Sequence, residues 1–86
     1  MVDERKKILL VDDDKFLLDM YTIKFKEANF DITPAFSGEE GLEKLKGGLD
    51  PDLILFDLIM PGLNGIEFLE EVIKNKYAEK AALVVL

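Results

Sequence analysis

The chain has 86 residues, of which 49% are hydrophobic and 34% charged, a size and composition typical of one globular domain. Eighteen acidic against eleven basic residues give a net charge of -7, so we expect neither nucleic acid nor an anionic membrane surface as a partner. The chain has no cysteine and no histidine, which excludes disulfides, thiolate metal sites and a histidine phosphoryl carrier. Any metal site must therefore use oxygen ligands.

The amino-terminal segment, Met1 to Lys7, precedes an apolar run of only four residues. Such a run is too short for the core of a signal peptide and far too short to span a bilayer. We therefore expect a cytoplasmic protein, with residues 1–86 forming one domain and no output domain.

The first half of the chain reads as strand, helix, strand and helix. The apolar run Ile8–Val11 predicts a strand that is buried on both faces. Apolar spacings of three and four predict an amphipathic helix from Lys15 to about residue 28, with an inner side formed by Leu17, Met20, Tyr21, Phe25 and Ala28. Residues 30–35 alternate like a short strand, and Pro34 suits the edge of a sheet.

A second helix is expected to begin at Ser37 and to end at Gly47. Ser37 and Glu40 have the spacing of a capping box, in which each side chain binds a free amide of the first turn. Gly41 lies inside this helix and should cost about 1 kcal/mol relative to alanine. We therefore expect this helix to be the least stable of the chain.

The second half repeats the alternation of strand and helix. Leu53–Phe56 predicts a third buried strand, and the loop that follows is rich in residues that break regular structure. A third helix is predicted from about residue 66 to residue 75, with an inner stripe of Ile66, Leu69, Val72 and Ile73. Residues 81–86 predict a fourth apolar strand, so the pattern is βαβαβαβ and indicates a parallel α/β sheet.

Two of the predicted strands end in carboxylates. Ile8–Val11 leads into the run Asp12, Asp13 and Asp14, and Leu53–Phe56 leads into Asp57. Ligands of parallel sheets bind beyond the carboxyl ends of the strands. If the two strands are neighbours, their carboxylates meet at one rim and repel one another unless a cation binds between them.

The acidic rim suits a hard cation and a phosphoryl group. Mg²⁺ prefers oxygen ligands, and Asp13 and Asp57 are its natural direct ligands here. An aspartate can also attack phosphorus to form an acyl phosphate, and Asp57, alone at its strand end, is the better candidate nucleophile. Each aspartate has a structural alternative, since Asp13 or Asp14 could simply cap the first helix. We interpret Met60 to Gly62 as a tight turn and Asn64 with Gly65 as part of a loop.

The chain resembles the receiver domain of two-component response regulators. The motifs that carry the resemblance are Ile8 to Asp14, Phe36 to Leu42, Asp52 to Gly62, and Asn64 to Leu69. It implies a flavodoxin-like, doubly wound parallel sheet with strand order 2-1-3-4.

The same resemblance assigns roles to the rim. It implies that Asp57 is the phospho-acceptor, that Asp12 and Asp13 are the acidic pair of a Mg²⁺ site, and that the backbone carbonyl of Ile59 is a third metal ligand. No other cofactor is implied. The phosphoryl donor would be a histidine of a sensor kinase or of a phosphotransfer protein.

Compared with the family, the fold is expected to be truncated. The fifth strand with its lysine, the last two helices, and the Ser or Thr after the fourth strand would be missing; Lys15 could substitute for the lysine, although a solvated role is favoured. The apolar fourth strand would then be an exposed edge, and we also expect the surroundings of Leu9, Val11 and Phe56 to be uncovered. We therefore expect a homo-oligomer, most simply a dimer, formed through the fourth strand or by exchange of elements.

Three functions fit these residues. The favoured function is a phosphoacceptor signalling module, with at most Mg²⁺-dependent autophosphorylation and autodephosphorylation. The first alternative is an inactive, self-associating receiver fragment with a structural role. The second is a phosphatase of the haloacid dehalogenase type, with Asp12 as nucleophile and Asp14 as acid, although Phe16 departs from that pattern.

Overall fold

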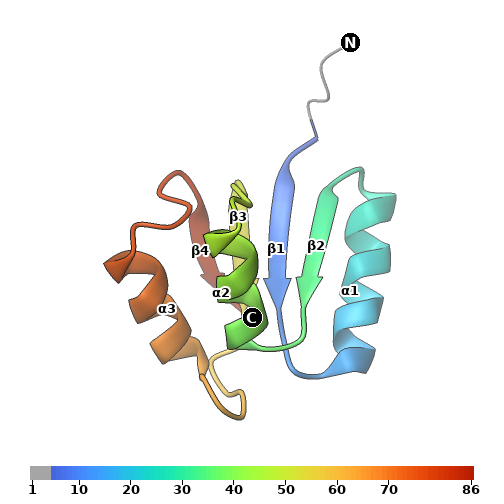
Figure 1. Cartoon of the computed structure of the whole chain (residues 1–86). Helices are drawn as coiled ribbons and strands as arrows, with labels where there is room; N and C mark the ends of the chain where they lie inside the picture. The colour runs from blue at the N-terminus through green and yellow to red at the C-terminus, as the bar shows by residue number, and fades with distance from the viewer. Residues whose placement is uncertain (1–4) are drawn as a thin grey trace.

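The computed structural model describes residues 5–86, so the expectation for the amino-terminal segment lies partly outside the described residues. The elements are β1 (Lys7–Val11), α1 (Lys15–Glu27), β2 (Asp31–Ala35), α2 (Gly38–Lys46), β3 (Leu53–Phe56), α3 (Gly65–Lys74) and β4 (Ala82–Val85). All four strands run parallel, in the order β2-β1-β3-β4 (Figure 1). The predicted α/β class and strand order are confirmed. Within residues 5–86, no helix has the length and apolarity needed to cross a membrane.

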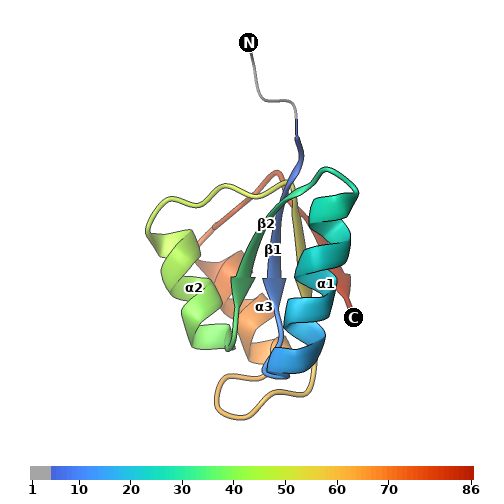
Figure 2. The same ribbon diagram turned by 90° about the vertical axis from the view of Figure 1, so that its right-hand side faces the viewer.

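The helices lie on opposite faces of the sheet. Figure 2 shows α1 on one face and α2 and α3 on the other. β1 is central, and its last residue, Val11, is in register with Ala35 of β2 and Phe56 of β3. The carboxyl ends of these three strands are therefore level, which brings the residues that follow them to one rim.

The face under α2 and α3 holds the larger core cluster. Leu9, Val11 and Phe56 alternate onto this face, and at most 1% of each is exposed. Phe68 of α3 packs there too, with its ring centroid 5.6 Å from that of Phe56. The expectation that these strand residues would be uncovered is therefore wrong, because α2 and α3 cover them.

The face under α1 holds the second cluster. Leu18 is the fully buried residue of α1, and it packs with Ile8, Leu10, Ile32 and Leu55. Met20 and Ala28, which we predicted on the inner side, are both exposed, Met20 to 40%. That assignment is wrong, because α1 has apolar residues around most of its circumference and the side that packs on the sheet is the one with Leu18.

The inner side of α3 also differs from the prediction. Phe68 and Val72 are buried, whereas Ile66 and Ile73 are 51% and 62% exposed. The predicted inner stripe is therefore wrong at Ile66 and Ile73. The side of α3 that packs on the sheet is the one that carries Phe68 and Val72. β4 is an edge strand whose four residues are all exposed, as expected for the fourth strand.

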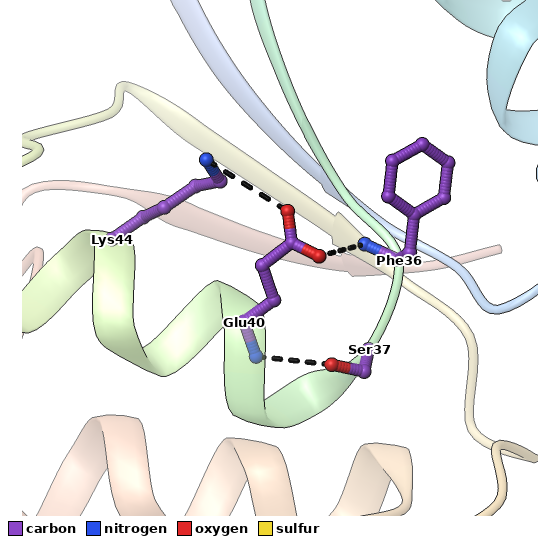
Figure 3. A network of polar contacts seen from close by, with 4 residues as sticks. All are labelled: Phe36, Ser37, Glu40 and Lys44. Carbon is purple, nitrogen blue, oxygen red and sulfur yellow. Dashed lines mark hydrogen bonds and ion pairs between the residues drawn. The ribbon is translucent and has the colours of Figure 1, made fainter.

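The first turn of α2 is fixed by a small polar network (Figure 3). The Ser37 hydroxyl accepts a hydrogen bond from the Glu40 amide at 3.0 Å, as predicted. The Glu40 carboxylate, however, accepts from the amide of Phe36 at 3.1 Å, one residue earlier than in a capping box, and lies 3.8 Å from the Lys44 ammonium. The start of the helix is therefore tied to the end of β2.

Gly41 allows α2 to approach the sheet closely. A Cβ atom at this position would lie 3.0 Å from Val11 Cγ2 and 3.1 Å from Phe68 Cε1, tighter than ordinary van der Waals contact. The loss of helix propensity at Gly41 is therefore accompanied by a packing function that the sequence pattern did not show.

Candidate functional site

Asp12 and Asp57 are held side by side by backbone hydrogen bonds beyond the ends of the strands. The Asp57 amide donates to the carbonyl of Val11 at 3.1 Å, so the ladder between β1 and β3 continues to this residue. The Asp12 amide donates to the carbonyl of Ala35 at 3.1 Å. The sheet itself therefore fixes the relative position of the two carboxyl groups.

Three carboxylates converge at this rim. Asp12, Asp13 and Asp57 each offer an oxygen, and the three oxygens lie within 4.8 Å of one another. Asp12 is buried, Asp57 is half-buried and Asp13 is exposed. An all-oxygen cluster of this kind matches the ligand preference of Mg²⁺, which usually keeps several water ligands when it binds to carboxylates.

The electrostatics of the cluster disfavour its fully charged form. Burial is the main cause that raises the pKa of Asp12 above its ordinary value, and the charges of Asp57, Asp13 and Asp14 raise it further. A hydrogen bond from the Asp14 amide to Asp12 Oδ1 at 3.0 Å opposes this rise. A divalent cation would relieve the repulsion that raises this pKa.

Asp14 belongs to the helix and not to the metal cluster. Its Oδ1 accepts hydrogen bonds from the amides of Phe16 and Leu17 at 3.0 and 3.2 Å, which makes it the N-cap of α1. The cap alternative is therefore confirmed for Asp14. This use of the carboxylate argues against Asp14 as the acid of a phosphatase. Lys15 is exposed at the helix start.

The loop after β3 holds Asp57 in place. Its Oδ1 accepts a hydrogen bond from the amide of Ile59 at 3.1 Å, while the Ile59 side chain is 85% exposed. Gly62 has φ +72°, a backbone conformation that favours glycine. The chain bends at residues 61–63, where a tight turn was predicted, and metal binding by the Ile59 carbonyl stays a prediction.

Asn64 and Glu67 form a capping box that the sequence analysis missed. The Asn64 side chain accepts from the Glu67 amide at 2.9 Å, and the Glu67 carboxylate accepts from the Asn64 amide at 3.2 Å. The spacing Asn-x-x-Glu before an apolar helix was the signal that could have found it. This cap starts α3 directly beneath the rim.

Gly65, the first residue of α3, packs against the backbone of the candidate phospho-acceptor. A Cβ atom there would collide with the carbonyl oxygen of Asp57 and would lie 2.5 Å from the Cα of Leu58. The Gly65 amide also donates to the carbonyl of Leu58 at 3.0 Å. Only glycine permits this approach, so the position of α3 and that of Asp57 depend on each other.

The fold and the rim together define a receiver-type module, in which a doubly wound parallel sheet presents carboxylates at the ends of its two central strands. A comparison with known families matches residues 8–86 to the response regulator receiver domain. The chain therefore belongs to the receiver domain family of response regulators.

Individual relatives agree with this assignment. The DNA-binding response regulator MtrA of Mycobacterium tuberculosis is 43% identical over 63 residues, which are 73% of this chain and 27% of MtrA. The transcriptional regulatory protein PhoP of Bacillus subtilis is 35% identical over 71 residues, which are 83% of this chain and 29% of PhoP. The chain thus spans less than a third of these two relatives.

Solved structures show the same fold. The chemotaxis protein CheY4 of Vibrio cholerae superposes with a TM-score of 0.87 at 26% identity, covering 94% of this chain and 67% of that one. The response regulator TrrA of Thermotoga maritima, solved in complex with Mg²⁺ and BeF, gives 0.82 at 34% identity, covering 93% and 67%. Receiver domains generally bind Mg²⁺ at the acidic pocket and interact with histidine kinases or phosphotransfer proteins.

Asp12→Asn is expected to stabilise the fold at neutral pH. The folded-state pKa of Asp12 lies above its ordinary value of 3.8, so its charge costs stability above the folded pKa, and this cost disappears as the pH falls below the ordinary value. The amide keeps the shape of the side chain and can still accept the hydrogen bond from Asp14. Without metal, we expect a gain of about 0.5–2 kcal/mol at pH 7.

Thermal unfolding at several pH values, in the presence of EDTA, measures this effect. The gain of Asp12→Asn over the wild type should shrink as the pH falls toward 3.8. Asp19→Asn, a matched change at an exposed position of α1, should change stability by less than about 0.5 kcal/mol. A destabilised Asp12→Asn variant at pH 7 would contradict the account.

Proposed function

We propose that this chain is a phosphoacceptor signalling module in which Asp57 accepts a phosphoryl group. The observation that carries the proposal is the convergence of Asp12, Asp13 and Asp57 within 4.8 Å in a chain of the receiver family. Asp57 is favoured as the acceptor because the Ile59 amide holds its Oδ1, which orients the second oxygen as the attacking atom. Family membership also supports a cytoplasmic location.

The residues present fit a Mg²⁺ ion. Asp12, Asp13 and Asp57 would bind it through carboxylate oxygens, and the backbone carbonyl of Ile59 would complete the protein ligands. All four are hard oxygen donors. Burial is the main cause of the raised pKa of Asp12, and the neighbouring carboxylates add a repulsion that a cation would remove. When bound, the ion neutralises the negative charge that gathers as a phosphoryl group approaches the carboxylates.

The proposed donor is a phosphohistidine of a sensor kinase or of a phosphotransfer protein. The Asp57 oxygen forms a bond to phosphorus while the bond between phosphorus and the imidazole nitrogen breaks. The electron pair of the broken bond stays on that nitrogen, and the other ring nitrogen of the phosphohistidine carries a proton, so the donor is left as a neutral histidine and Asp57 as an acyl phosphate. Attack of water on phosphorus would later return the carboxylate and release inorganic phosphate.

Acetyl phosphate with Mg²⁺ tests the proposal without a partner protein. Intact-mass spectrometry should detect one added phosphoryl group on the wild type and none on Asp57→Asn. Asp19→Asn, an isosteric change of an exposed aspartate, should be labelled like the wild type. Labelling that persists in Asp57→Asn would contradict the assignment, and a wild type that takes up no phosphoryl group would favour the inert, self-associating fragment.

The phosphatase alternative predicts a different pattern of loss. Turnover of a generic phosphomonoester that is abolished by Asp12→Asn, and not by Asp57→Asn, would identify Asp12 as the nucleophile. We expect no such turnover, because the carboxylate that would act as the acid, that of Asp14, caps α1.

We also propose that copies of this chain associate through β4. The exposed fractions of Leu83, Val84 and Val85 are 38%, 43% and 47%, and the strand is the last of the sheet in the part of the chain that the structure describes. Unpaired backbone groups on an apolar edge strand without a charged residue favour pairing with another strand. A homodimer is the simplest such assembly.

A further inference from the structure

Asn64 and Gly65 form an asparagine-glycine pair where the loop after β3 enters α3 (Figure 1). In such a pair the backbone nitrogen of the glycine can attack the side-chain carbonyl of the asparagine, because glycine has no side chain that hinders the approach. The other two asparagines, Asn29 and Asn75, precede residues with large side chains, which obstruct the same attack. Asn64 is therefore the position in this chain where deamidation is chemically easiest.

We propose that Asn64 is a modification site that the folded acceptor site keeps closed, and that its isoaspartyl product disconnects α3 from Asp57. The modification is a spontaneous deamidation, so it needs water and no enzyme. The loss of acceptor function, unlike the closure of the site, rests on the phosphoacceptor role proposed above.

Deamidation at this pair has two steps. The Gly65 nitrogen forms a bond to Cγ of Asn64, the bond from Cγ to the side-chain nitrogen breaks, and that nitrogen leaves as ammonia with the proton of the Gly65 amide. Water then opens the succinimide ring at one of its two carbonyl carbons. Opening at Cγ gives aspartate, whereas opening at the backbone carbonyl carbon gives isoaspartate, in which the main chain runs through Cβ and Cγ.

Hydrogen bonds keep the reacting atoms apart in the folded protein. The Gly65 amide donates to the carbonyl of Leu58 at 3.0 Å, so its N–H points toward the end of β3. Oδ1 of Asn64 accepts from the Glu67 amide at 2.9 Å, and the Asn64 amide donates to the Glu67 carboxylate at 3.2 Å. Asn64 also has an extended backbone, with ψ 175°, whereas ring closure requires the Gly65 nitrogen to rotate into line with Cβ. The reaction therefore requires the first turn of α3 to open.

Opening of this turn breaks contacts with the acceptor residue and with the core. Gly65 is buried, and a Cβ atom there would collide with the carbonyl oxygen of Asp57. The carbonyl of Asn64 accepts a hydrogen bond from the amide of Phe68 at 2.8 Å, and Phe68 belongs to the larger core cluster. We therefore expect the pair to react only in the locally opened form of this segment.

Isoaspartate would not fit the position of Asn64. It lengthens the backbone before Gly65 by one atom, and it places a carboxylate directly on Cα, in place of the side chain that caps α3. Gly65 already lies as close to the backbone of Asp57 as a glycine can, so an added atom must displace α3 or the end of β3. Aspartate, by contrast, keeps the ordinary backbone and is as good an N-cap as asparagine.

Ageing the 86-residue chain at mildly alkaline pH, folded or in urea, tests the closure. Peptide mapping by mass spectrometry should find deamidation at Asn64 in urea, and a rate lower by about tenfold or more in the folded chain, because only the open form reacts. In urea, Asn29 and Asn75 should react more slowly than Asn64. Equal rates at Asn64 in the folded and the unfolded chain would overturn the proposal.

Glu67→Ala should make the site easier to open. It removes the hydrogen bond from the Asn64 amide, so deamidation of the folded chain should become severalfold faster, while the rate in urea stays the same. Glu70→Ala, a matched change at an exposed position of the same helix, should leave both rates unchanged. A folded Glu67→Ala variant that reacts no faster than the wild type would overturn the proposed closure.

The two products of deamidation test the link to the acceptor. The isoaspartyl form, isolated from aged protein by chromatography, should be labelled by acetyl phosphate about tenfold or more slowly than the unaged chain, since a small misplacement of a reacting group is this costly. Asn64→Asp, which is identical to the other product, should be labelled at the wild-type rate. Equal labelling of the isoaspartyl form and Asn64→Asp would overturn the link, whereas an unaged wild type without labelling would refute the phosphoacceptor function and not the closure.

Discussion

Gly65→Ala should destabilise the protein by about 1–3 kcal/mol, the range for forcing an extra carbon into a well-packed site. The new Cβ atom would collide with the carbonyl oxygen of Asp57, so either α3 or the end of β3 must move. Alanine is the better helix former by about 1 kcal/mol, and we expect the cost of the collision to exceed this gain. Since the displaced backbone belongs to Asp57, the variant should also bind Mg²⁺ more weakly than the wild type.

Urea unfolding, with and without Mg²⁺, measures both effects of Gly65→Ala. Gly47→Ala is the matched control, because Gly47 is exposed at the end of α2 and a Cβ atom there would meet no heavy atom closer than 3.3 Å. Gly47→Ala should change stability by less than about 0.5 kcal/mol. If Gly65→Ala were as stable as this control, the proposed link between α3 and the rim would be wrong.

Phe68→Ala should have the largest effect on folding, a loss of about 3–5 kcal/mol. The ring is fully buried and touches both the sheet, at Phe56, and the surface of α2, next to Gly41. Its removal would leave a cavity between three elements that no neighbouring side chain fills without moving. Since domains are typically stable by only about 5–15 kcal/mol, such a loss is a large fraction of the total stability.

Chemical unfolding of Phe68→Ala should be compared with that of Phe16→Ala. Phe16 is 76% exposed at the start of α1, so the same truncation there should change stability by less than about 0.5 kcal/mol. Equal losses in the two variants would contradict the assignment of Phe68 to the centre of the core.

The topology of this protein follows closely from its sequence. Uninterrupted apolar runs such as Leu53–Phe56 predicted strands to within a residue or two, because a strand buried on both faces must be apolar throughout. Because every residue of such a run is apolar, the sequence does not show which face of the sheet each side chain lies on. The sequence therefore could not show that Leu9 and Val11 point toward α2 and α3.

The inner sides of the helices were less predictable. In α1 the apolar residues Phe16, Met20 and Ile23 lie on the solvent side, opposite Leu18, so periodicity alone did not identify the buried side. In α3 the exposed apolar residues Ile66 and Ile73 likewise led periodicity to the wrong side of the helix. Which apolar stripe is buried was decided by the neighbouring helix and the sheet, which a local pattern does not contain.

The sequence predicted which residues form the candidate site, but not the packing that holds them in position. The ends of two strands indicated Asp12, Asp13 and Asp57, and the family resemblance implied that β1 and β3 are neighbours, which the register confirms. The dependence of this arrangement on Gly65 could not be read from the sequence, because it depends on how closely α3 approaches the end of β3.

The central claim is that the carboxylates at the ends of two adjacent strands together bind one divalent cation. Crystals grown with Mn²⁺, which also prefers oxygen ligands, allow the ion to be located by its anomalous scattering. We predict one strong peak in contact with carboxylate oxygens of Asp12, Asp13 and Asp57, next to the backbone carbonyl of Ile59. A map with no peak at this rim, and with the three side chains turned away from one another, would contradict the account.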